Sequence, residues 1–81
     1  MNIFVAKLDY GVSDSELNQL FEEYGAVDSA RVIMDRDTGR SKGFGFVEMN
    51  NDEEAMQAIS ALDGMDVRGR NIVVKKAEPR R

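Results

Sequence analysis

Cysteine and histidine are both absent from the 81 residues of this chain. Without cysteine there can be no disulfide bond, no cysteine zinc cluster and no thiol nucleophile, a composition that fits a reducing compartment. Without histidine the chain lacks the commonest general base and the commonest metal ligand. We therefore expect no metal site, no cofactor and no enzymatic activity.

Long apolar runs are missing as well. No stretch approaches the roughly 20 residues that a membrane-spanning helix needs, and Lys7 interrupts the N-terminal segment too early for a signal peptide. We expect a cytoplasmic protein that does not bind membranes. The length fits one compact domain, which we place at residues 1–77, followed by a short basic tail at 78–81.

Hydrophobic periodicity predicts four strands and two helices, in the order strand, helix, strand, strand, helix, strand. Strands are expected at residues 2–8, 27–34, 42–49 and 70–76. Helices are expected at residues 14–24 and between Asn51 and Gly64. The fold class is therefore α+β: a βαββαβ ferredoxin-like sandwich with two helices on one face of a four-stranded antiparallel sheet.

Both predicted helices have terminal signals. Ser13 with Glu16, and Asn51 with Glu54, have the spacing of a capping box, in which each side chain bonds the other residue's backbone amide. Gly25 is placed to end the first helix in a left-handed cap. These signals fix the helix boundaries that the apolar spacing suggests.

Net charge argues against a nucleic-acid ligand at first sight, since 15 acidic and 11 basic residues leave the chain at −4. The two predicted helices, however, contain no lysine or arginine, so every cation lies on the sheet, the loops or the tail. Acidic residues in the first turn of a helix also favour its macrodipole. Because local potential steers a polyanion, the net charge limits non-specific affinity without excluding nucleic acid.

The third predicted strand carries the main functional signal. Side chains alternate between the faces of a strand, so Val47, Met49 and two glycines, Gly43 and Gly45, face the helices, where a glycine leaves room for close packing. The opposite face then receives Lys42, Phe44, Phe46 and Glu48. Neighbouring strands add Phe4, Arg31, Ile33 and Lys75 to that face, whereas Ala30, Val32 and Met34 point toward the helices.

Exposed phenylalanines on a sheet need an explanation. Burial under a second layer is the usual one, but both helices lie on the other face, so a dimer through the sheet is the surviving structural alternative. The functional alternative is a platform on which bases stack, because aromatic faces accept any base. We favour the platform and expect a monomer.

Lys42–Met49, with the sequence KGFGFVEM, resembles the octamer of the RNA recognition motif family, from which Met49 departs. Residues 3–8, IFVAKL, resemble the family's hexamer, with Lys7 where asparagine is common. The element order and the loop at 35–42 match the family too. The chain is similar to short single-motif proteins of bacteria and to the motif of plant glycine-rich RNA-binding proteins, without the glycine-rich tail.

The resemblance implies single-stranded RNA binding, with a role in post-transcriptional regulation or a chaperone-like action on RNA. It implies base stacking on Phe4 and Phe44, sugar packing by Phe46 and a phosphate contact by Lys42. It also implies that the RNA is bordered by further residues of the sheet, loop and tail, namely Asn2, Lys7, Arg31, Ile33, Arg40, Lys75, Arg80 and Arg81.

Three other functions stay open. Acylphosphatase-like enzymes share the element order, but they need an arginine in the loop after the first strand, and residues 9–13 contain none. A protein partner on the acidic helix face is the second alternative. Single-stranded DNA is the third, because stacking does not distinguish the sugar and only contacts to the 2′-hydroxyl do.

Overall fold

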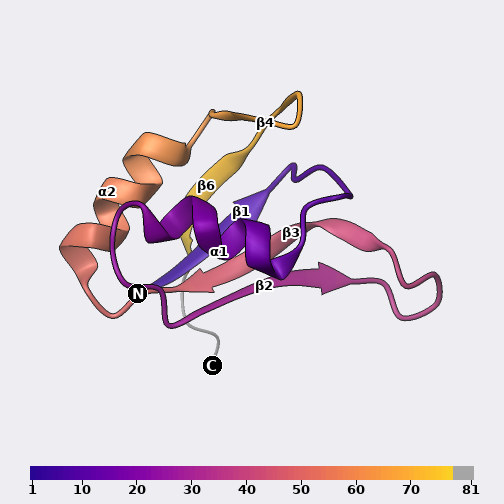
Figure 1. Ribbon diagram of the computed structural model, residues 1–81, viewed down its shortest axis with the longest axis horizontal. Helices are drawn as coiled ribbons and strands as arrows, with labels where there is room; N and C mark the ends of the chain where they lie inside the picture. Colours follow the sequence, from indigo (N-terminus) through magenta and orange to yellow (C-terminus); the bar gives the residue numbers. More distant parts are fainter. Residues whose placement is uncertain (78–81) are drawn as a thin grey trace.

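A computed structural model describes residues 1–77 as a four-stranded antiparallel sheet with two helices (Figure 1). The strands are β1 (Asn2–Ala6), β2 (Ser29–Met34), β3 (Ser41–Glu48) and β6 (Val73–Ala77), in the order β2-β3-β1-β6. Helix α1 (Asp14–Glu22) contacts β2 and β3, and α2 (Asp52–Leu62) contacts β6. The predicted βαββαβ fold is confirmed. Neither helix of the described part is long and apolar enough to cross a membrane.

One hydrophobic core lies between the helices and the sheet. Alternate residues of β1 and β3, among them Ile3, Val5 and Val47, are fully or almost fully buried. Phe21 of α1 is the largest buried side chain. Since the buried set alternates strictly along β3, residues between its members must point to the opposite face.

Gly45 leaves room for both the neighbouring strand β2 and helix α1. A Cβ atom there would lie 2.5 Å from the carbonyl oxygen of Arg31 and 3.2 Å from a methyl group of Leu17. The prediction that this glycine makes room for a helix is confirmed. Gly43 has a different reason: its φ is +81°, and a Cβ there would lie 3.3 Å from the ring of Tyr10.

Each predicted capping box is only half formed. Ser13 Oγ accepts the Glu16 amide at 3.2 Å, and Asn51 Oδ1 accepts the Glu54 amide at 2.9 Å. The returning bonds are replaced, because the Glu16 carboxylate pairs with Arg68 and the Glu54 carboxylate accepts the Ala26 amide at 3.3 Å. Both glutamates thus join a helix to a distant segment.

The left-handed cap predicted at Gly25 is wrong. Helix α1 ends at Glu22, and its cap residue Glu23 has right-handed backbone angles. Gly25 is not among the residues with positive φ. Its lack of a side chain serves packing instead, since a Cβ there would overlap the Glu54 side chain of α2.

The two outer strands of the sheet, β2 and β6, each donate one backbone amide to a helix aspartate. Val32 donates to Asp14 Oδ1 at 2.7 Å, and Val74 donates to Asp63 Oδ1 at 2.9 Å. Asp14 belongs to the first turn of α1 and Asp63 follows the last turn of α2. These bonds satisfy donors that an edge strand would otherwise expose.

Met34 does not face the core as the alternation of β2 predicts. Its side chain is 51% exposed. The pairing of β2 with β3 shifts register between Val32 and Met34. A bulge of this kind reverses the expected alternation beyond it.

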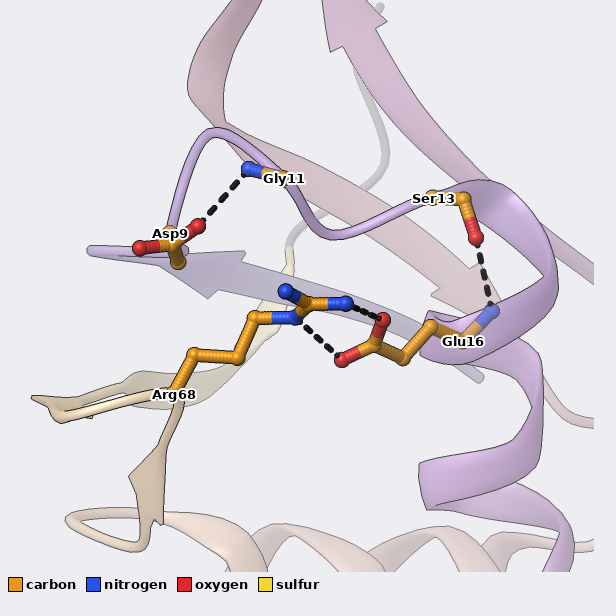
Figure 2. A network of polar contacts seen from close by, with 5 residues as sticks. All are labelled: Asp9, Gly11, Ser13, Glu16 and Arg68. Carbon is orange, nitrogen blue, oxygen red and sulfur yellow. Dashed lines mark hydrogen bonds and ion pairs between the residues drawn. The ribbon is translucent and has the colours of Figure 1, made fainter.

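A small hairpin that the sequence analysis missed precedes the last strand. β4 (Asp66–Val67) pairs with β5 (Arg70–Asn71), so the predicted strand at 70–76 is divided. Arg68 and Gly69 have φ of 55° and 85°, as a two-residue type I′ turn requires. The Arg68 guanidinium donates to both Glu16 oxygens, at 2.9 and 2.8 Å, and so fastens the hairpin to α1 (Figure 2).

The Arg68 hydrogen bonds lower the pKa of Glu16. The contribution of this pair to the free energy of unfolding should be constant above the ordinary glutamate pKa of about 4.3. It should disappear as the pH falls through the lowered pKa of folded Glu16. Glu16→Gln, compared with the wild type in urea melts at successive pH values, should show this dependence.

The matched control is the same substitution in an Arg68→Ala background, where the pH-dependent difference should vanish. If it persists there, Arg68 is not its source.

Lys7 follows β1 with φ of 58°, a left-handed conformation that strains any residue with a Cβ. Lys7→Gly should therefore raise the free energy of unfolding by about 1 kcal/mol. Lys7→Ala removes the same amino group but keeps the Cβ, so it should give no gain. Equal stabilisation by both variants in chemical denaturation would show that charge, and not strain, is relieved.

Candidate nucleic-acid interface

Three phenylalanine rings form a cluster on the sheet face opposite the helices. The ring of Phe4 lies 5.9 Å from that of Phe44 and 5.5 Å from that of Phe46, and the last two rings are 6.3 Å apart. Phe46 is 42% exposed, and Phe4 and Phe44 are half-buried. No helix of the described part contacts this face, so the rings form an open apolar surface.

The strand register places a cation at each end of a row that crosses the sheet. Phe46 of β3 is paired with Phe4 of β1. Arg31 of β2 is the partner of Phe46 on one side, and Lys75 of β6 is the partner of Phe4 on the other. Directly paired residues point to the same face. The aromatic row, Arg31–Phe46–Phe4–Lys75, therefore places two aromatic rings between two positive charges.

The other predicted binding residues lie around this row. Ile33 of β2 is half-buried, whereas Asn2 of β1 and Lys42 of β3 are exposed. Arg40 is exposed at the end of the β2–β3 loop, residues 35–40, which projects from one end of the sheet (Figure 1). Arg80 and Arg81 lie outside the described residues.

Lys7 is exposed where β1 leaves the sheet. Its left-handed backbone gives a physical meaning to the departure from asparagine, because asparagine tolerates positive φ better than most other residues. Lysine at this position therefore adds a positive charge at the end of β1 at the cost of backbone strain.

A second contact that the sequence does not predict joins a loop to the small hairpin beside the sheet. The guanidinium carbon of Arg70 lies 5.3 Å from the ring centre of Tyr10, in cation–π geometry. Tyr10 is 63% exposed. Nothing in the local pattern signals this pair, since its partners are 60 positions apart and the hairpin that brings Arg70 there was not predicted.

The distribution of charge agrees with the prediction in part, because Lys76 is paired with the buried Ile3 and Arg68 bonds Glu16 of α1. Within the described residues, α1 and α2 contain only acidic charges, and exposed lysines and arginines lie on the sheet and its loops. No cluster of three or more acidic side chains in residues 1–77 is arranged to hold a metal ion. The electrostatic character of the open face is therefore mixed, with Glu48 as an acid among the cations.

Residues 3–73 match the RNA recognition motif family. This chain belongs to that family. RbpB of Nostoc sp., a protein named for RNA binding, is 50% identical over 80 residues, which are 99% of this chain and 78% of RbpB. Chloroplast RNA-binding proteins and ribonucleoproteins of plants match at 47–53% identity, and this RNA recognition motif spans only 23–34% of their length.

Solved structures show the same fold. The crystal structure of RNA Binding Protein PG1 is 51% identical, with a TM-score of 0.95 over all of this chain and 98% of that one. A complex of the Sex-lethal protein of Drosophila melanogaster with RNA is 33% identical, with a TM-score of 0.91 over 96% of this chain and 47% of that one. The predicted likeness to bacterial and plant RNA recognition motifs is confirmed.

The exposed rings should matter little to folding. Phe46→Ala should lower the free energy of unfolding by about 1 kcal/mol or less, because it loses ring–ring contacts but opens no cavity. Phe21→Ala, a matched change in the core, should cost about 3–5 kcal/mol. Comparable losses in urea melts would show that the open face is structural.

Proposed function

We propose that this RNA recognition motif binds single-stranded RNA by stacking bases on Phe4 and Phe44 and packing Phe46 against the sugars. The observation that carries the proposal is the aromatic cluster on the face away from the helices. Such a surface costs solvation free energy in the free protein, and flat apolar bases are suitable to cover it.

Cations around the cluster suit the phosphates of the same strand. Arg31 and Lys75 end the aromatic row, and Lys42 lies two residues before Phe44. A single strand that crosses the sheet can thus place bases on rings and phosphates beside charges. Asn2, Ile33, Arg40 and Lys7 would border the strand, and Arg80 and Arg81 are proposed to close over it.

Family membership favours a binding module over an enzyme. The Sex-lethal complex with RNA supports RNA as the ligand class. Within that class we propose a role in post-transcriptional regulation or a chaperone-like action, performed by a monomer in the cytoplasm.

Removing one ring tests the stacking. Phe44→Ala should weaken the binding of a short single-stranded RNA by about 1–3 kcal/mol, measured by fluorescence anisotropy, with folding intact. Phe44→Tyr keeps the aromatic face and should retain the affinity. Unchanged affinity in Phe44→Ala would contradict the platform. The same oligonucleotides made with deoxyribose separate RNA from single-stranded DNA.

Removing one cation tests the phosphate contact. Lys42→Ala should weaken binding of all sequences alike and reduce the slope of log K against log salt by about 1.

An NMR titration with pooled short RNAs then locates the surface of the protein that binds RNA. Shifts confined to α1 and α2 would support the protein-partner function instead.

A further inference from the structure

Glu48 is an acid on the face that carries the phenylalanines. It is exposed at the end of β3, two residues beyond Phe46, and by alternation it points to the same face as Phe44 and Phe46. Within residues 1–77 its carboxylate takes part in no ion pair. A free carboxylate repels phosphate, so it weakens the binding of any nucleic acid unless it contacts a base.

The register places Glu48 in a polar row next to the aromatic row. Asn2 of β1 and Ser29 of β2 are its direct partners, so the polar row is Ser29–Glu48–Asn2. Two residues along a strand separate adjacent rows on one face by about 7 Å. A base that stacks on Phe4 can therefore direct one edge toward this row, because Asn2 lies two residues before Phe4 and is paired with Glu48.

The chemistry of the two side chains selects among the bases. An ionised carboxylate only accepts hydrogen bonds and holds two adjacent donors best. Guanine alone has adjacent N–H donors on its Watson–Crick edge, at N1 and N2. Adenine and cytosine place an acceptor beside their amino group, and uracil flanks its single N–H with two carbonyl oxygens. The Asn2 amide can donate to the remaining guanine oxygen.

We propose that Glu48, supported by Asn2, is a specificity-determining residue that selects guanine beside the aromatic row. The inference rests on the proposed RNA binding and names the base that this part of the site accepts. The carboxylate lowers the affinity of the protein for RNA in general, because it repels phosphates. Two hydrogen bonds from guanine N1–H and N2–H offset that loss.

The test uses seven-residue uridine RNAs with a single guanosine placed at each position in turn, with all-uridine RNA as the reference. Wild-type protein should bind the best guanosine RNA about tenfold more tightly in fluorescence anisotropy at fixed salt. Replacing that guanosine by inosine, which lacks the N2 amino group, should remove most of the preference.

Glu48→Gln should change the two affinities in opposite directions. It should lose the guanosine preference, because an amide places a donor against one of guanine's donors. It should bind all-uridine RNA about twofold more tightly at low salt, because a negative charge leaves the face. Glu53→Gln, the same charge change on exposed α2, is the matched control and should preserve the preference.

The outcomes separate the two proposals. Binding without a guanosine preference, or a preference that survives in Glu48→Gln, overturns the role of Glu48 and leaves the stacking function standing. Failure of the wild type to bind any RNA overturns the proposed function and this inference together.

Discussion

The lack of a side chain at Gly45, which lets both the backbone of β2 and the Leu17 side chain of α1 come close to β3, is the constraint on which the packing of the sheet depends. Gly45 has no side chain, so α1 lies directly against β3, and a Cβ there would meet both a backbone oxygen and the helix. With the helices on that side, the neighbours of Gly45 must face the other way. Core and open face are therefore linked, because the alternation of β3 puts Gly45 on the helix side and its neighbours Phe44 and Phe46 on the other.

The sequence predicted the fold well where periodicity and local signals agreed. The main strands and both helices were foreseen because core residues recur at the spacing of a strand or helix over several turns or pleats. Failures occurred where distant contacts decide. The carboxylates of Glu16 and Glu54 bond remote segments and do not complete the predicted capping boxes. Gly25 makes room for the Glu54 side chain and does not end α1 in a left-handed turn. Local sequence patterns cannot predict these contacts, because the partners lie far apart in the sequence.

The three phenylalanines of the candidate site were predicted to share one face of the sheet, but their arrangement on it was not. Alternation alone placed Phe4, Phe44 and Phe46 on one face, and a motif resemblance named the same rings. Pairing register could not be obtained from one chain, because it depends on how strands slide past one another. The rows across the sheet appeared only in the structure, and with them the position of Glu48 beside the phenylalanine rings.

The two aspartates at the sheet margins have a consequence for how copies of this protein behave together. Asp14 and Asp63 occupy amide donors on β2 and β6, the two places where a foreign strand could extend the sheet. An added strand would have to displace this carboxylate from the amide, and its own carbonyl groups would then lie close to the negative charge. A carboxylate bonded to each outer strand therefore disfavours the addition of a strand from a second copy of this module.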